Sequence, residues 1–250
     1  MGVCYHKAVT DFQPDTYGES FADVYDDWYR GITDAEATAT FVSARVGPGP
    51  VLELGVGSGR LAKPLAERGL RVLGIDASSS MLDRCRVAVP GIPLVRADLA
   101  QLPIGGSIGG ALCAFNTIFN LPTAAAQGQL FAGLASVLDS RGAVIVEAIT
   151  GASLGEGPAT SVGVSRMTTD RVVLSATVLD AGAQQIRGQH IDISERGIRL
   201  RPWLLRWSTP DQLDELANAA GLHLTERYGG WHEESFHPES DTHISVYQHR

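Results

Sequence analysis

The sequence is poor in cysteine, in positive charge and in long apolar runs. Its three cysteines, Cys4, Cys85 and Cys113, form no Cys-x-x-Cys pair, and an odd number without a framework indicates a reducing compartment. The formal net charge of -8 provides no basic groove, which argues against nucleic acid as a partner. The N-terminus lacks a basic stretch followed by an apolar run, and no apolar run reaches membrane length. We therefore expect a cytoplasmic protein that binds neither nucleic acid nor a membrane.

The middle of the chain alternates between two kinds of pattern. Apolar runs predict strands at 51–54, 71–75, 92–96, 110–115 and 142–149. Helical patterns lie among them at 59–68, 78–88 and 124–138. Strands that alternate with helices predict a doubly wound parallel sheet, and the nearly continuous apolar runs are typical of strands covered on both faces.

The flanking segments carry other signals. Residues 33–46 predict a helix that begins with a capping box of Thr33 and Glu36. After a glycine-rich loop at 151–163, alternation predicts antiparallel strands at 171–180, 185–194 and 198–207. A helix at 210–220 follows, capped by Thr209 and Gln212, and strands at 222–228 and 243–249 end the chain.

These patterns predict an α/β fold in four parts. Its centre is a doubly wound, mostly parallel, seven-stranded Rossmann-like sheet, with a small antiparallel β cap and an N-terminal helical lid. The parts are the lid (1–46), the ligand-binding core (47–150), the β cap with the substrate region (151–208) and a C-terminal segment that completes the core sheet (209–250). The cap strands either cover the site or pair with a second subunit, so a homo-oligomer stays open.

A glycine-rich loop follows the first strand, in the sequence Val51-Leu-Glu-Leu-Gly-Val-Gly-Ser-Gly-Arg60. A loop that leaves a parallel strand and opens a helix presents unpaired N–H groups, and glycine lets a ligand approach the backbone. The dinucleotide fingerprint Gly-x-Gly-x-x-Gly is not met, because Arg60 stands where its third glycine belongs. The pattern present is Glu-x-Gly-x-Gly-x-Gly, with Glu53 inside a strand where a carboxylate must find donors.

Two more acids end successive strands. Asp76 closes the second strand, where a carboxylate can accept hydrogen bonds from two ribose hydroxyls. Asp98 closes the third strand, and with Leu99 beside it can contact an adenine amine against an apolar wall. Each acid alone is more often a cap or a turn residue, but their order on successive strand ends favours a ligand site.

The combination resembles the class I S-adenosylmethionine (SAM)-dependent methyltransferases. The match is carried by "VLELGVGSGR", "GIDASSSML", "RADLAQLP", "AFNTIFNL" and "GAVIVEAIT", all within residues 51–149. The N-terminal stretch "TYGESFADVYDDWY" is similar to that of the small-molecule N-methyltransferases that act on amino sugars and in antibiotic tailoring. The resemblance implies SAM as cofactor and S-adenosylhomocysteine as product, with a small-molecule acceptor.

The resemblance also implies roles for individual residues. Those expected to bind the cofactor are Tyr25, Tyr29, Glu53, Gly55, Gly57, Asp76, Ala77, Met81, Asp98, Leu99 and Phe115. Tyr17 and Asn120 are the expected catalytic residues, although related enzymes have histidine where Asn120 stands. Phe115, Phe119, His190 and Trp231 are expected to bind the acceptor.

The residues after the fourth strand indicate which kind of methyl transfer to expect. Phe115-Asn-Thr-Ile118 lacks the Asn/Asp-Pro-Pro-aromatic motif of nucleobase methyltransferases, and no carboxylate cluster suits Mg²⁺, so we expect no metal. Transfer to an amine nitrogen by in-line displacement is the first hypothesis, because an amine needs little help from a base. An O-methyltransferase and a non-catalytic SAM-binding protein are the alternatives.

Overall fold

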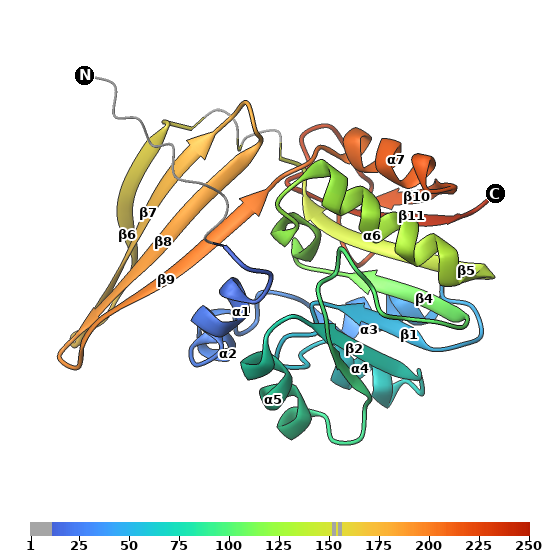
Figure 1. The fold of residues 1–250 in the computed structure, drawn as a ribbon, viewed down its shortest axis with the longest axis horizontal. Coiled ribbons are helices and arrows are strands. Elements are labelled where there is room, and N and C mark those ends of the chain that lie inside the picture. The colour runs from blue at the N-terminus through green and yellow to red at the C-terminus, as the bar shows by residue number, and fades with distance from the viewer. Residues whose placement is uncertain (1–11, 152–153, 155–156) are drawn as a thin grey trace.

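The computed structural model describes residues 12–151, 154 and 157–250, and these form two sheets joined by helices (Figure 1). Seven strands make the larger sheet, in the order β10-β11-β5-β4-β1-β2-β3. Five of them are parallel, while β11 is antiparallel to β5 and to β10. The strands are β1 (Val51–Leu54), β2 (Val72–Asp76), β3 (Leu94–Arg96), β4 (Ile108–Cys113), β5 (Leu138–Ile149), β10 (Leu222–Tyr228) and β11 (Thr242–His249). The predicted fold class is confirmed.

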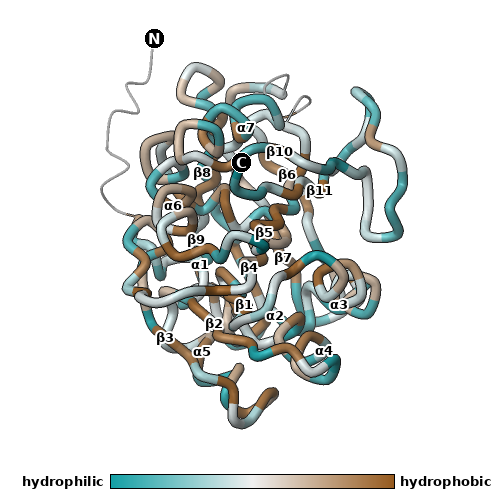
Figure 2. Tube along the Cα trace, turned by 90° about the vertical axis from the view of Figure 1, so that its right-hand side faces the viewer, coloured by the Kyte–Doolittle hydropathy of each residue, from teal (hydrophilic) through white to brown (hydrophobic). Residues whose placement is uncertain are grey.

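Helices cover this sheet on both faces. They are α3 (Ala35–Ser43), α4 (Ala62–Glu67), α5 (Ser79–Ala88), α6 (Ala124–Val137) and α7 (Pro210–Ala219), with a short 3-10 helix, η2 (Thr117–Asn120), after β4. All side chains of β1 and β4 are buried, as their unbroken apolar runs require. Figure 2 shows the apolar segments gathered along the central strands. Among the described residues no helix is long and apolar enough to cross a membrane.

The second sheet is antiparallel and stands beside the core (Figure 1). Its strands run in the order β6 (Thr160–Met167), β7 (Arg171–Asp180), β8 (Gln185–Ser194) and β9 (Gly197–Arg206). Two short helices, α1 (Thr16–Phe21) and α2 (Tyr25–Trp28), lie between this cap sheet and the core. Phe21 and Trp28 pack with Val173 of the cap sheet and Met81 of the core in one apolar cluster. The first eleven residues of the expected lid lie outside the described residues.

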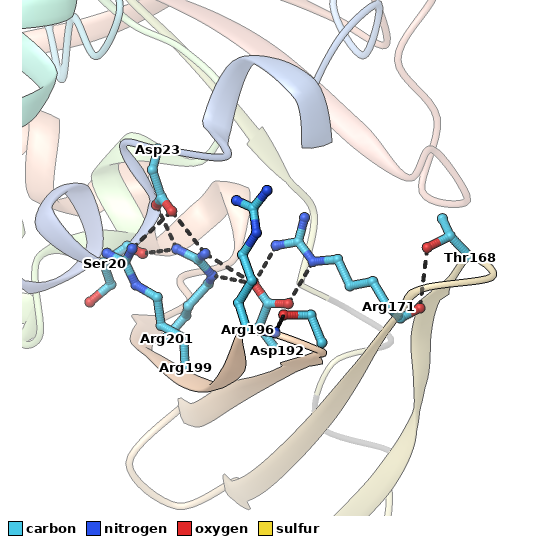
Figure 3. Close-up of polar contacts among 9 residues, drawn as sticks. Ser20, Asp23, Thr168, Arg171, Asp192, Arg196, Arg199 and Arg201 are labelled. Atoms are coloured by element: carbon cyan, nitrogen blue, oxygen red, sulfur yellow. Dashed lines mark hydrogen bonds and ion pairs between the residues drawn. The ribbon is translucent and has the colours of Figure 1, made fainter.

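A buried ionic network also joins the lid to the cap sheet (Figure 3). Arg201 of β9 is 2% exposed and donates to the carbonyl of Ser20 at 2.6 Å and to both carboxylate oxygens of Asp23. On its other side Arg201 donates to Asp192 of β8, which also pairs with Arg171 of β7. Each buried charge therefore has a partner of opposite sign, which is the condition for tolerating it in the interior.

Two sequence-based predictions need correction. The N-cap of α3 is Asp34, whose carboxylate accepts from the N–H of Ala37, whereas the hydroxyl of Thr33 has no partner. An aspartate at that place accepts the same hydrogen bond, so the helix begins one residue later than the capping box predicted. The loop was predicted to extend to residue 163, but β6 begins at Thr160. Every residue of this edge strand is exposed, so it has no burial pattern from which a strand could be predicted.

Candidate functional site

A cavity of about 570 Å³ lies between the carboxyl ends of the core strands, the lid helices and the cap sheet. Ligands of open α/β sheets bind at this end of the strands. Thirteen of the predicted site residues line the cavity: Tyr17, Tyr25, Tyr29, Gly55, Gly57, Asp76, Ala77, Met81, Asp98, Leu99, Phe115, Asn120 and His190. They come from segments far apart in the sequence, so the fold assembles one site from them.

The glycine loop after β1 is held open by the next strand. Gly55 and Gly57 have φ of +67° and +54°, a region that glycine enters at little cost. The N–H of Gly57 donates to Asp76 Oδ2 at 2.9 Å, while Asp76 Oδ1 accepts from the N–H of Ser78. A Cβ at Gly57 would meet nothing nearer than 3.9 Å, so the backbone there is open to a ligand.

The two strand-end acids differ in their surroundings. Burial raises the pKa of Asp76 above its ordinary value, against the hydrogen bonds from Ser78 and Gly57 that favour its carboxylate. Asp98 accepts from the N–H of Ala100 at 2.9 Å and is only partly buried. Both carboxylates line the cavity, which gives it two hydrogen-bond acceptors at the ends of neighbouring strands.

A smaller cavity of about 30 Å³ opens behind the glycine loop and is lined by Glu53, Arg60 and Tyr25. Glu53 is 4% exposed, and its Oε2 has no hydrogen-bond partner in residues 12–151, 154 and 157–250. Nη1 of Arg60 is likewise buried and unpartnered there. Burial raises the pKa of Glu53 to about 8, although Arg60 opposes the shift. An unpartnered carboxyl oxygen of Glu53 and an unpartnered guanidinium nitrogen of Arg60 around one space fit the ammonium and carboxylate of an amino acid, such as the methionine part of SAM.

The corner after β4 holds a strained backbone at the cavity wall. Phe115 and Asn116 are consecutive non-glycine residues with φ of +52° and +61°. Glu147 of β5 accepts from the N–H of Phe115 at 2.7 Å, and the amide oxygen of Asn116 accepts from the N–H of Ile149 at 2.7 Å. Trp231 Nε1 donates to the other oxygen of Glu147 at 2.9 Å. These contacts over-determine the corner, which is how strained backbone persists at functional sites.

Aromatic rings from the lid form the roof. Tyr17 stacks on Phe21 with ring centroids 4.6 Å apart, and its hydroxyl donates to that of Tyr29 at 3.2 Å. Tyr29 in turn makes an edge contact with Phe115 across the cavity. Burial, with the neighbouring tyrosines, raises the pKa of Tyr17 well above 10, so its hydroxyl stays protonated at neutral pH.

His190 and Trp203 form the wall on the side of the cap sheet. Their ring centroids lie 6.1 Å apart, and His190 also meets Phe21 and Trp28 edge to face. Nδ1 of His190 and Nε1 of Trp203 are both buried and find no hydrogen-bond partner in the part of the chain that the structure describes. Burial lowers the pKa of His190, so the neutral imidazole predominates at neutral pH.

The structure places two of the expected acceptor residues away from the cavity lining. Phe119 is fully buried in the core beneath η2 and does not line the cavity. Trp231 packs against Phe41, and its indole N–H is used by Glu147, so it reaches the site only through that carboxylate. The sequence shows that an aromatic residue follows the strand, but it does not show whether the ring points into the cavity or into the core.

Sequence reasoning also missed residues of the site. Glu147 lies in the middle of an apolar run and Trp203 in a strand of the cap sheet, while Arg60 was noted only as a departure from a glycine pattern. The acid within the run at 142–149 was a usable signal, because a carboxylate in a buried strand needs donors. Within the described ranges, no three histidine, cysteine, aspartate or glutamate side chains are grouped so as to hold a metal ion.

Comparison with known proteins agrees with this geometry. Residues 51–142 match the model of a methyltransferase domain family. An uncharacterised methyltransferase of Oceanobacillus iheyensis is 40% identical over 53 residues, a match that covers 21% of this chain and 25% of that protein.

Similarity to solved structures extends over nearly the whole chain. The CcbJ methyltransferase of Streptomyces caelestis is 35% identical with a TM-score of 0.87, over 95% of this chain and 99% of that one. SAM-bound CalS10, an amino pentose methyltransferase of Micromonospora echinaspora involved in calicheamicin biosynthesis, is 21% identical with a TM-score of 0.67, over 98% of this chain and 100% of that one. The second likeness, at this identity, concerns the fold alone.

Proposed function

Because the chain belongs to the SAM-dependent methyltransferases, we propose that it transfers a methyl group to an amine nitrogen of a small natural product. The observation that carries the choice of nitrogen is the lack of a strong base near the acceptor end of the cavity, among the residues described. Asp76 and Asp98, at the cofactor end, are the charged side chains of its described lining. An amine that has lost its ammonium proton to solvent attacks through its own lone pair, whereas a hydroxyl needs a base.

The cofactor is proposed to lie along the carboxyl ends of β1, β2 and β3. Glu53 and Arg60 would hold the ammonium and carboxylate of its methionine part, Asp76 its ribose and Asp98 its adenine, with Met81 and Leu99 as apolar walls. When bound, SAM supplies a methyl carbon on a sulfonium, which is already activated for displacement. The residues of this chain then have to bind, align and exclude water.

The acceptor is proposed to lie between the lid, the β4 corner and the cap sheet. The hydroxyl of Tyr17 and the amide of Asn120 would hydrogen-bond the amine and orient its lone pair. The rings of Tyr17, Tyr29 and Phe115 would surround the reacting centre, where their faces favour positive charge. Transfer would give the protonated N-methyl amine and S-adenosylhomocysteine, and the proton on that nitrogen would exchange with solvent once the product has left.

Transfer to oxygen is the second candidate, and His190 is the observation that favours it. Its neutral ring lines the cavity with an unpartnered nitrogen, which is the form that a general base requires. Its lowered pKa, however, makes it a weak base for an alkyl hydroxyl.

Methyl-labelled SAM tests the proposal directly. The protein would be offered amino sugars and cyclic secondary amines in one panel and phenols and carboxylic acids in another, with mass spectrometry to locate the label. Label on nitrogen is the expected result. Label on oxygen alone, lost in His190→Phe, would replace the proposal by O-transfer. Tight SAM binding with no labelled product in either panel would favour the non-catalytic binding protein.

We also propose that the protein forms a homo-oligomer through the outer face of the cap sheet. The outer face of the cap sheet exposes Val162, Val164, Met167, Ile198 and Leu200, each more than half accessible. Large exposed apolar patches are unusual on monomers. Analytical ultracentrifugation of the wild type and of Val164→Lys would separate an oligomer that uses this face from a monomer.

A further inference from the structure

We propose that Trp203 and His190 form an anchor for a neutral hydroxyl group of the acceptor, separate from the amine that receives the methyl group. The inference rests on the proposed function and specifies which amines that function serves. The anchor would be the indole Nε1–H of Trp203 on β9 and the imidazole Nδ1 of His190 on β8, two side chains that line the same cavity.

Both nitrogens are buried and lack partners among the described residues. A buried polar group that finds no partner costs about 1–3 kcal/mol, so folds rarely leave two such groups side by side without use. The ring centroids lie 6.1 Å apart and both side chains line the cavity, so the two nitrogens belong to one stretch of its wall. A ligand group bound at this wall would supply the partners that the described residues do not.

The chemistry of the two nitrogens selects the group. An indole N–H only donates, so the ligand atom must be an acceptor. A neutral imidazole whose other nitrogen donates to the protein has an acceptor lone pair, and the Leu174 backbone is the partner that stabilises the proton on the His190 ring. A hydroxyl oxygen accepts from one side and donates to the other, which a methyl group cannot do.

The charged residues of the cavity lining argue against a charged group of the acceptor at this place. Among the described lining residues, arginine and lysine are absent, and the two carboxylates, Asp76 and Asp98, belong to the cofactor end. A carboxylate or phosphate on the acceptor would have no cation there to offset its desolvation. The anchor therefore favours a neutral hydroxyl over a charged group.

A glycine opposite Trp203 shows that the indole has a fixed place. Gly188 of β8 pairs with Trp203 of β9, and a Cβ at position 188 would lie 2.0 Å from Cε2 and 2.5 Å from Nε1 of the indole. The backbone of Gly188 is not in the left-handed region, so the missing side chain serves the ring and not the conformation. Substitution of Gly188 must therefore displace the indole.

The test compares 4-hydroxypiperidine with 4-methylpiperidine, secondary amines of the same size, as methyl acceptors. Wild-type kcat/KM is expected to be at least tenfold higher for the hydroxyl compound. Trp203→Phe and His190→Phe should each bring the ratio close to one, mainly through KM, and Gly188→Ala should act as Trp203→Phe does. His223→Phe is the matched control, because His223 also has an unpartnered buried nitrogen but does not line the cavity; its ratio should stay at the wild-type value.

A binding measurement distinguishes failure of the hydroxyl anchor from failure of the proposed N-methyl transfer. The four tryptophans give four indole N–H signals, which ¹⁵N spectra of protein saturated with S-adenosylhomocysteine resolve and Trp203→Phe assigns. A shift of the Trp203 signal with the hydroxyl compound and not with its methyl analogue supports the anchor, with or without turnover. Equal methylation of both amines, or no selective shift, would overturn the anchor and leave N-transfer standing. Label found on oxygen would instead overturn the proposed function.

Discussion

The core sheet and the cap sheet both bury polar groups, but they differ in how those groups are paired. In the core, Asp76 accepts hydrogen bonds from two backbone N–H groups, and one carboxyl oxygen of Glu53 has no partner among the described residues. In the cap, Asp192 and Arg201 are satisfied by each other and by the lid. The core therefore leaves a polar atom without a partner beside the cavity, whereas the cap sheet uses paired charges to hold α1 and the residues after it.

We expect the largest effect on stability from the ionic network of the cap sheet. Arg201→Ala removes the partner that Ser20, Asp23 and Asp192 share, and leaves Asp192 with Arg171 alone. Loss of one member of a buried pair costs several kcal/mol, so we expect the free energy of unfolding to fall by about 3 kcal/mol in denaturant titration. Arg199→Ala is the control, because Arg199 also pairs with Asp23 but is 53% exposed; it should cost less than about 1 kcal/mol. Equal losses for the two variants would mean that the buried network does not hold the lid.

On the core side, Asp76→Ala should act on the ligand more than on the fold. We expect SAM binding to weaken by about 1–3 kcal/mol, because the ribose loses its acceptor and the Gly57 N–H loses its partner. Isothermal titration calorimetry gives the dissociation constant. Asp83→Ala, which removes an exposed carboxylate, is the control and should bind normally. An unchanged constant for Asp76→Ala would contradict the ribose role.

We expect Glu53 to make cofactor binding depend on pH. Its pKa of about 8 means that the free protein holds a proton there at neutral pH, while an ammonium group is best met by the carboxylate. Binding should then release about one proton, and affinity should rise up to tenfold per pH unit from pH 6 to about 8. Glu53→Gln should flatten this dependence. The same proton stabilises the ligand-free fold below pH 4.5, and that stability is lost as pH rises towards 8. Binding without proton release in buffers of different ionisation enthalpy would rule this account out.

A single carboxylate also ties the lid to the core, and its effect should be smaller. Glu19 accepts hydrogen bonds at the N-terminus of α5 from the hydroxyl groups of Ser78, Ser79 and Ser80 and from the N–H of Ser80. The Ser80 hydroxyl contributes most to lowering the pKa of Glu19 to about 2, so the contact is complete above pH 4.5 and is lost as pH falls through about 2. Glu19→Gln should make the lid several-fold more sensitive to proteolysis at neutral pH. Asp27→Asn, on the exposed side of the lid, is expected to leave the cleavage rate unchanged.

The smallest effect concerns the strained β4 corner. Trp231→Phe keeps the ring but removes the N–H that orients Glu147, and Glu147 holds the N–H of Phe115. We expect kcat to fall by about two- to tenfold, the worth of one hydrogen bond, with SAM affinity unchanged. Trp207→Phe, whose ring is buried elsewhere in the core, is the comparison for lost packing. A fall in SAM affinity without a change in kcat would place the corner with the cofactor and not with catalysis.

Prediction from sequence was accurate where contacts are local. The capping box of Thr209 and Gln212 is present on α7, and β7 and β8 have the predicted bounds, because a cap or an alternation is contained within a few residues. Phe119 and Trp231 do not line the cavity as expected, because their positions depend on contacts that are distant in the sequence. Which face of η2 is buried depends on α6, and the partner of Trp231 lies 84 residues away.

The amino-acid sequence by itself determined the order of strands and helices, the doubly wound sheet and the glycine loop with its two acids. These follow from hydrophobic periodicity and from the conformations that glycine allows, which are properties of short segments. Only the tertiary structure decided that Arg201 joins the lid to the cap, that Glu53 faces Arg60 across an unfilled space, and that His190 meets Trp203 beside Gly188. Each of these depends on residues from different elements, and the free energy of a buried polar group is set by the partner that folding brings to it.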